Sequence, residues 1–310
     1  MNTPPSESPS GMRTRRIWVC ADPHTGHVSD GRDGGEWFRE AVDDICGLEE
    51  TVDFALCLGD MSYQSLEQEL QTYRTASRDS CISRWYEIPG NHDMRSVFSG
   101  LYESVIGCPR YWKITDGNTA FISLPAERGN AAGLLVPEVQ KWLEQTISEC
   151  RQMNIVICAH QFPYGTVENS TRSERCLYPR DAVAQFISTV PIDAWLGGHI
   201  HSGRRTPAAA VHKDNTTYIN VASVSHTYHT EICNSFLLEF TEGERTVRAL
   251  CRDHDHSTFI PEQSLEIPLR FPAVFNSGSE VFEAFPVQVP ERYRTIEPEQ
   301  VTSDMFDEKV

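Results

Sequence analysis

The sequence lacks the features that place a chain in a membrane or on a polyanion. No stretch approaches the roughly 20 consecutive apolar residues that a transmembrane helix needs. Basic residues are scarce: 27 Lys and Arg stand against 44 Asp and Glu, so the formal net charge is −17. Because nucleic acids and anionic membranes are bound by basic surfaces, we expect no extended nucleic acid and no membrane as partner. A small phosphate-bearing substrate stays compatible, since a local metal charge can overrule a net charge.

The sequence also lacks a recognisable leader and a regular cysteine spacing. The pair Arg15–Arg16 is followed by a short apolar run, Ile17–Ala21, which cannot form the hydrophobic region of a signal peptide. The ten cysteines are scattered and form no CxxC pair. We therefore expect reduced, mostly buried thiols rather than a disulfide framework or a thiolate zinc site. These features predict a cytoplasmic protein.

Composition divides the chain into three segments. Residues 1–15 are rich in Pro and Ser and are predicted to form a disordered tail. Residues 16–256 carry the apolar patterns of one folded domain. Residues 257–310 form a Pro-rich arm with an acidic end, where the density of proline opposes regular structure. We expect this arm to lie over the domain surface, and the alternative is a contact in a homo-oligomer.

Short apolar runs alternate with segments of helical periodicity, which predicts an α/β fold with parallel strand pairs. The predicted buried strands are Ile17–Ala21, Phe54–Leu58, Trp85–Ile88, Ile155–Ala159 and Ala194–Leu196. The predicted helices are Gly35–Leu48, Ser65–Arg78 and Pro137–Gln152. Further runs predict a second, mixed sheet, and these are Tyr111–Thr115, Thr119–Leu124, Thr217–Val221, Ser235–Phe240 and Arg245–Cys251.

Each of the five buried strands ends in potential metal ligands. These clusters are Asp22-Pro23-His24, Gly59-Asp60, Gly90-Asn91-His92-Asp93, His160 and Gly198-His199-Ile200-His201. One such cluster alone is explained by a turn, a helix cap or a buried structural histidine. Five in succession favour one site, because α/β sheets bind ligands just outside the carboxyl ends of their strands.

These blocks resemble the calcineurin-like metallophosphoesterase superfamily, whose signature is DxH, GDxx, GNH[DE], a lone His and GHxH. All of them occur here in that order between residues 22 and 201. The flanks are similar to those of class III cyclic-nucleotide phosphodiesterases and related glycerophosphodiesterases. Residues 89–95 read PGNHDMR, which matches their PGNHDxR, and residues 160–163 read HQFP, which resembles their HHPP.

The resemblance implies a four-layer α/β/β/α sandwich of two mixed sheets over residues 16–256, with two metal ions of Mn, Fe or Zn. It assigns Asp22, His24 and His201 to the first ion. Asp60 would bridge both ions, and Asn91, His160 and His199 would hold the second. Carboxylate and imidazole ligands suit these metals, and such a pair lowers the pKa of a bridging water.

The resemblance also implies roles for the residues that follow Asn91. A metal-bridging hydroxide would attack phosphorus, and His92 would act as the general acid toward the leaving alkoxide. Asp93 would orient His92, as carboxylates commonly do for imidazoles. Arg95 either binds the phosphate or lies on the surface.

One block departs from the phosphodiesterase pattern. The segment after Gly59 reads GDMSY, so Tyr63 stands where those relatives usually have Asp or Asn. This resembles the GDxxY block of purple acid phosphatases, in which the tyrosine binds ferric iron. Those enzymes have DxG where this chain has Asp22-Pro23-His24, so His24 and Tyr63 would compete for one position. We expect His24 to be the ligand and Tyr63 to line the substrate pocket.

The predicted function is hydrolysis of a small phosphodiester of the cyclic-nucleotide or glycerophosphodiester type. His226 follows a predicted strand and is a further candidate for substrate binding. The main alternative is a phosphomonoesterase acting on nucleotides or phosphoproteins. A more distant alternative is a non-catalytic scaffold, because some proteins of this fold have lost their metals.

Overall fold

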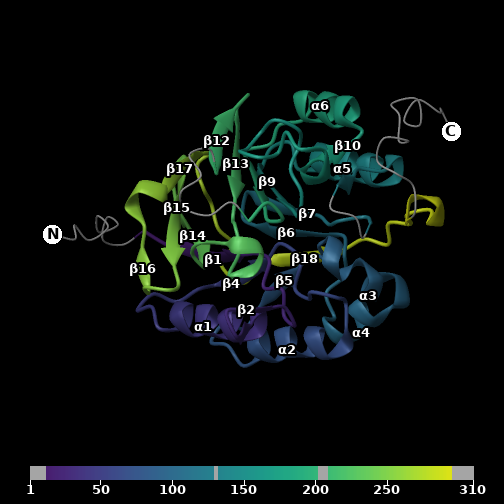
Figure 1. Cartoon of the computed structure of the whole chain (residues 1–310). Helices are drawn as coiled ribbons and strands as arrows, with labels where there is room; N and C mark the ends of the chain where they lie inside the picture. Colours follow the sequence, from purple (N-terminus) through teal and green to yellow (C-terminus); the bar gives the residue numbers. More distant parts are fainter. Residues whose placement is uncertain (1–11, 129–131, 202–208, 295–310) are drawn as a thin grey trace.

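A computed structural model describes residues 12–128, 132–201 and 209–294. Two stacked sheets form its centre, with helices covering the outer face of each (Figure 1). The helices below are α1 (Gly34–Cys46) and α2 (Glu67–Arg78), and those above are α5 (Pro137–Glu149) and α6 (Arg180–Thr189). This arrangement confirms the predicted α/β/β/α sandwich.

The first sheet has the strand order β16-β15-β14-β1-β4-β5, and β17 also pairs with β15. Its strands are β1 (Thr14–Cys20), β4 (Phe54–Cys57), β5 (Trp85–Glu87), β14 (Asn234–Thr241), β15 (Thr246–Asp253), β16 (Thr258–Phe259) and β17 (Leu265–Pro268). β1, β4 and β5 are parallel, whereas β14 runs antiparallel to β1. The carboxyl ends of β1, β4 and β5 therefore lie at one edge of the sheet.

The second sheet has the order β12-β13-β11-β9-β7-β6-β18. Its strands are β6 (Trp112–Asp116), β7 (Thr119–Leu124), β9 (Asn154–Ala159), β11 (Ala194–Gly197), β12 (Ala210–Lys213), β13 (Thr216–Asn220) and β18 (Val281–Ala284). The four central strands β7, β9, β11 and β13 are parallel, and the outer ones are antiparallel.

Shorter elements link the two sheets and their helices. They are β2 (Val28–Ser29), β3 (Arg32–Asp33), α3 (Met94–Ser99), α4 (Leu101–Val105), β8 (Gly133–Leu134), β10 (Leu177–Tyr178) and the 3₁₀ turns η1 (Asn91–Asp93), η2 (Ser173–Arg175), η3 (Thr227–His229), η4 (Pro261–Gln263) and η5 (Glu291–Arg294).

Alternation along the strands divides the apolar core into two parts. In β9, Val156 and Cys158 face the first sheet, whereas Ile155 and Ile157 face α5 and α6. Because successive side chains of a strand point to opposite faces, an unbroken apolar run is required wherever both faces are covered. This explains why the central strands read as continuous apolar runs in the sequence.

The segment predicted as a Pro-rich arm contributes one strand to each sheet. β17 pairs with β15, and β18 pairs with β6. Both are edge strands, where proline is tolerated because one side of the strand needs no hydrogen bond. Between them, Arg270 forms an ion pair with Asp193 at 3.0 Å.

One cysteine pair corrects the expectation of reduced thiols. Cys46 at the end of α1 and Cys81 after α2 form a disulfide with a Cα–Cα distance of 5.6 Å. The sequence separation is 35 residues, so no local motif signals the pair. The packing of α1 beside α2 brings the two residues together, and the other cysteines are buried and form no disulfide.

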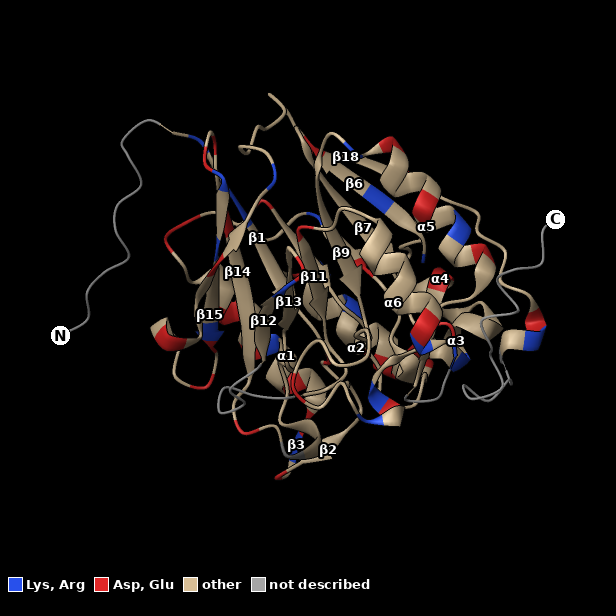
Figure 2. Cartoon of the chain, turned by 90° about the horizontal axis from the view of Figure 1, so that it is seen from above, with Lys and Arg blue, Asp and Glu red and all other residues tan. Residues whose placement is uncertain are grey.

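Charged side chains lie mainly on helices and loops, and the central strands β9, β11 and β13 carry none (Figure 2). Within the described ranges, no helix has both the length and the apolar character needed to cross a bilayer.

Candidate metal centre

The seven predicted metal ligands lie together where strand ends of both sheets meet. We call the space among their side chains the crevice. Several of them adopt left-handed backbone conformations, with φ of +55° at Asp22, +46° at His24, +53° at Asp60, +66° at His199 and +52° at His201. Such conformations are unfavourable for residues with a Cβ and concentrate at functional sites. At the GHIH block they form the turn that lets both histidines face the crevice.

The loops after β1 and β4 are tied to each other by backbone hydrogen bonds. The amide of Asp22 donates to the carbonyl of Gly59 at 3.0 Å, and the amide of His24 donates to that of Asp60 at 2.9 Å. Gly59 has φ of +100°, and a Cβ there would lie 2.5 Å from Nδ1 of His160. Only glycine therefore allows the β4 loop to approach the histidine of the second sheet so closely.

The first group of ligands contains Asp22, His24 and His201. Nε2 of His201 lies 3.0 Å from Oδ1 of Asp22 and 3.1 Å from Nε2 of His24. Nε2 of His24 lies 3.7 Å from Oδ1 of Asp22. Three candidate ligand atoms from two strand ends thus lie close together, and these residues could hold one metal ion.

The second group contains Asp60, Asn91, His160 and His199. Nε2 of His160 lies 3.3 Å from Oδ2 of Asp60 and 3.1 Å from Oδ1 of Asn91. The same Oδ2 of Asp60 lies 3.7 Å from Nε2 of His24 in the first group. One carboxylate oxygen therefore stands between the two groups, where a bridging ligand is expected.

The hydrogen-bonding partners of the histidines leave lone pairs directed at the crevice. Nδ1 of His160 lies 2.8 Å from the carbonyl of Leu58, and Nε2 of His199 lies 3.1 Å from the carbonyl of Glu174. Because a carbonyl only accepts, these nitrogens carry the protons and the other ring nitrogens are available to a metal. Nδ1 of His24 is buried without any hydrogen-bonding partner.

Burial and the neighbouring charged groups shift the pKa values of the histidines in the crevice. Burial lowers the pKa of His160, but the adjacent Asp60 carboxylate raises it to about 9. Burial, and then the neighbouring His160, lower the pKa of His199 to about 3. Burial also lowers the pKa of His24 well below its usual value. Carboxylate oxygens and imidazole nitrogens gathered in this way form a donor set that fits metal ions.

His92 lies beside both groups on η1. Its backbone amide donates to Oδ1 of Asp60 at 2.8 Å, and its Nδ1 donates to the carbonyl of Tyr63 at 2.7 Å. Its ring stacks on that of Tyr63, with centroids 5.5 Å apart. Nε2 of His92 therefore faces the crevice, and the ring of Tyr63 lies beside it.

The partner expected for His92 was Asp93, but the structure gives Asp93 another position. Its carboxylate accepts from the Ser62 hydroxyl at 2.6 Å and from the amides of Ser62, Met61 and Gly90. Consecutive residues of a 3₁₀ turn point in different directions, so Asp93 turns into the protein when His92 faces out. Asp93 fixes the β4 and β5 loops together, and burial followed by repulsion from Asp60 raises its pKa to about 6.

Tyr228 completes the crevice, and sequence reasoning did not find it. Its backbone is left-handed, with φ of +48°, and its hydroxyl lies 3.4 Å from Nε2 of His92. Its ring contacts those of His24 and His201, with centroids 5.5 Å apart in each case. Burial and a hydrogen bond to Tyr63 raise the pKa of Tyr228. Its left-handed backbone conformation distinguishes Tyr228 in the structure, but no sequence pattern reveals that conformation.

Two predicted substrate contacts lie elsewhere. Arg95 is exposed on α3, with no contact to the crevice side chains among the described residues. His226 turns away from His92, since its ring packs against Trp37 and its Nε2 lies 3.0 Å from Oδ1 of Asp255.

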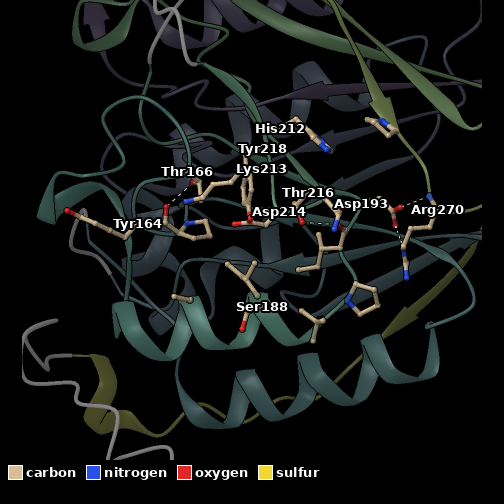
Figure 3. A pocket seen from close by; sticks show the side chains of 18 of the residues that line it. Tyr164, Thr166, Ser188, Asp193, His212, Lys213, Asp214, Thr216, Tyr218 and Arg270 are labelled. Carbon is tan, nitrogen blue, oxygen red and sulfur yellow. Dashed lines mark hydrogen bonds and ion pairs between the residues drawn. The ribbon is translucent and has the colours of Figure 1, made fainter.

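A cavity of about 870 Å³ lies outside the crevice, between α6 and the turn that joins β12 to β13 (Figure 3). Tyr164, His212, Asp214 and Ser188 line it, and the ion pair of Asp193 with Arg270 lies at one end. None of the seven predicted ligands contributes to its wall. Its size alone does not make it the catalytic site, because it lacks the clustered acceptors of the crevice.

Comparison with known proteins supports this interpretation of the crevice. The sequence profile described as calcineurin-like phosphoesterase matches residues 15–203. A dimetal phosphatase from Danio rerio has a similar structure, with a TM-score of 0.63, 14% identity, and coverage of 82% of this chain and 98% of that one. Purple acid phosphatase PPD1 from yellow lupin (Lupinus luteus) seeds gives a TM-score of 0.57 and 11% identity, covering 84% of this chain and 55% of that one. No curated protein matches the chain significantly.

Proposed function

Since the chain belongs to the calcineurin-like phosphoesterase family, a family of metal-dependent phosphoric ester hydrolases, we propose that it hydrolyses a small phosphodiester. The observation that carries this proposal is the arrangement of donors in two groups that share Asp60. Asp22, His24 and His201 would hold one ion, and Asn91, His160 and His199 the other. Manganese, iron and zinc all suit these nitrogen and oxygen donors.

When bound, such a metal pair supplies Lewis acidity toward the phosphoryl oxygens and lowers the pKa of bound water. The protein supplies the proton for the leaving group. Because Nδ1 of His92 donates to the Tyr63 carbonyl, its Nε2 faces the crevice and can protonate the leaving alkoxide. The bond from the His92 amide to Asp60 keeps this ring at a fixed place beside the ligands.

Two sequence features favour different substrates. The PGNHDMR and HQFP segments favour a diester of the cyclic-nucleotide or glycerophosphodiester type. The GDMSY block, with Tyr63 at the crevice, favours a phosphomonoesterase as the second candidate. We place the diester first because two segments, PGNHDMR and HQFP, favour it, whereas one block favours the monoester.

Turnover of bis-p-nitrophenyl phosphate against p-nitrophenyl phosphate separates these candidates. Cyclic nucleotides, glycerophosphodiesters and monoesters should then be assayed with Mn²⁺, Fe²⁺ and Zn²⁺. We expect faster turnover of the diesters, and a consistent preference for monoesters would replace the first candidate with the second. Fewer than one tightly bound metal per chain, with no turnover after Mn²⁺ addition, would contradict both.

A ferric–tyrosinate absorption band after iron loading would make Tyr63 a ligand in place of His24.

A further inference from the structure

A second set of metal-ligating side chains lies outside the crevice. His226, Cys233 and Asp255 each direct one ligand atom to a common point, and all three atoms lie within 4.8 Å of one another. His226 and Cys233 come from the segment between β13 and β14, and Asp255 comes from the turn between β15 and β16. None of the three belongs to the donor groups at the dinuclear centre.

The orientation of His226 prepares its ring for a metal. Its Nδ1 lies 2.8 Å from the carbonyl of Thr230, so Nδ1 carries the proton of the neutral ring. The lone pair on Nε2 then points at Oδ1 of Asp255, only 3.0 Å away. Two acceptors at this distance need a cation or a proton between them. A backbone carbonyl that fixes the ring is the usual support for a metal-binding histidine.

We propose that His226, Cys233 and Asp255 bind a zinc-type ion at a site separate from the dinuclear centre. One thiolate, one imidazole and one carboxylate form a donor set typical of zinc with a fourth, open position. Cys233 is buried, whereas the side chains of His226 and Asp255 are 20% and 19% exposed, so water can reach that position. Tetrahedral zinc places its ligand atoms about 3.3–3.8 Å apart, so the three groups need only small adjustments.

Metal binding at this site releases a proton from Cys233. The thiol is hydrogen-bonded to Asp255, and burial followed by this carboxylate raises its pKa. A bound dication replaces the thiol proton, which passes to solvent. Arg32, which stacks on Trp37 at 3.6 Å, is a nearby positive charge that favours the thiolate.

The ion would join the loop beside the crevice to the turn of the first sheet. Thr227 and Thr230, which follow His226, each place an oxygen 3.5 Å from Nδ1 of His201. Tyr228 lies between them. Occupancy of this site would therefore restrain the loop that lines the dinuclear centre, and in this respect the inference rests on the proposed function.

Cobalt substitution tests the site directly, because a cobalt–thiolate bond gives an intense near-ultraviolet absorption band that nitrogen and oxygen ligands do not. The dinuclear centre has no sulfur donor among its candidate ligands. We expect the band in the wild-type chain and in Cys150→Ser, which changes a buried thiol elsewhere, but not in Cys233→Ser. Zn²⁺ should abolish the band, and Asp255→Asn should weaken Co²⁺ binding at least about tenfold.

The outcomes separate this inference from the proposed function. Absence of the band in wild type, or its persistence in Cys233→Ser, would overturn the zinc-type site. Turnover of bis-p-nitrophenyl phosphate measured on the same samples tests the dinuclear centre independently. If Cys233→Ser does not fold, Asp255→Asn takes its place, since that side chain is partly exposed, and unchanged cobalt affinity in that variant would equally overturn the proposal.

Discussion

At the scale of single residues, His92 has its two ring nitrogens in different roles. Nδ1 is held by the Tyr63 carbonyl, and Nε2 faces the crevice beside Tyr228. Its distance from the ligands also allows a different role, because His24, Asp60 and His92 have ligand atoms within 4.8 Å of one another. Metal content and turnover must therefore both be measured on a His92 variant, to distinguish proton transfer from metal binding.

We expect His92→Ala to keep its metals. For a diester with an alkoxide leaving group, its kcat should fall by roughly 10²–10⁴, the usual contribution of one general acid. Asp60→Ala should instead lose both metals and nearly all turnover, because its carboxylate stands between the two groups. Metal analysis and kcat measured on both variants check this. A metal-free His92→Ala protein would make His92 a ligand.

Buried Glu127 predicts a pH-dependent stability. Burial raises its pKa to about 7, although Arg110 and the Tyr111 hydroxyl offset part of the effect. The unfolded chain releases this proton near pH 4.5, so the folded state binds more protons between pH 4.5 and 7. The free energy of unfolding contributed by Glu127 should therefore fall by about 1–3 kcal/mol as pH rises through this window.

Urea unfolding at pH 5 and pH 8 measures this effect. Glu127→Gln should show a smaller loss of stability between the two pH values than the wild-type chain. Part of the loss should remain, because burial also raises the pKa of Glu87 to about 7. The exposed variant Glu50→Gln serves as control and should behave like wild type. Equal pH dependence in Glu127→Gln and wild type would contradict the assignment.

The proximity of the seven candidate ligands could be inferred from sequence, because each follows a strand whose apolar run marks its end. The hydrogen-bonding partners that position the side chains of the site could not be predicted. The Tyr63 carbonyl that orients His92, and the loop amides that surround Asp93, are backbone groups whose meeting depends on how two loops pack. Residue types do not encode such contacts, and Asp93, adjacent to His92 in sequence, was therefore given the wrong partner.

At the scale of secondary structure, continuous apolar runs predicted strands and helical apolar periodicity predicted helices. The predicted strand Phe54–Leu58 corresponds to β4, and the predicted helix Pro137–Gln152 corresponds to α5. Helix α6 was missed because it is short, with 10 residues, and follows a long irregular segment. β18 was missed because all of its side chains are exposed, so it has no alternation to detect.

The disulfide between Cys46 and Cys81 should stabilise the fold by linking the end of α1 to the segment after α2. A cross-link spanning 35 residues should contribute about 2–4 kcal/mol to the free energy of unfolding. We expect Cys81→Ser to lose this amount in urea unfolding without reductant. Dithiothreitol should destabilise the wild-type chain equally and leave the variant unchanged. A titration that finds ten free thiols, rather than eight, in the denatured and unreduced wild type would contradict the bond.

At the scale of the whole molecule, the site depends on more chain than the family match contains. The match ends at residue 203, just beyond His201. Yet β14 pairs with β1, and the hydroxyls of Ser223 and Ser225 hold the carbonyl of Asp22 at 2.8 and 3.0 Å. The net charge of the chain is −17, and two of its carboxylates, Asp22 and Asp60, are buried at the crevice.

Because ligands from both sheets meet at the crevice, metal binding should stabilise the fold as a whole. Binding at 100 times Kd contributes about 2.7 kcal/mol per site, so two sites contribute about 5 kcal/mol. For a chain of this size, chelation should lower Tm by about 10 °C. Calorimetry on the Cys233→Ser background isolates the proposed dinuclear centre, because the proposed zinc-type site then lacks its thiolate. Adding Asp60→Ala to that background should abolish the response to chelator, whereas an undiminished response would show that the stabilising ions bind elsewhere.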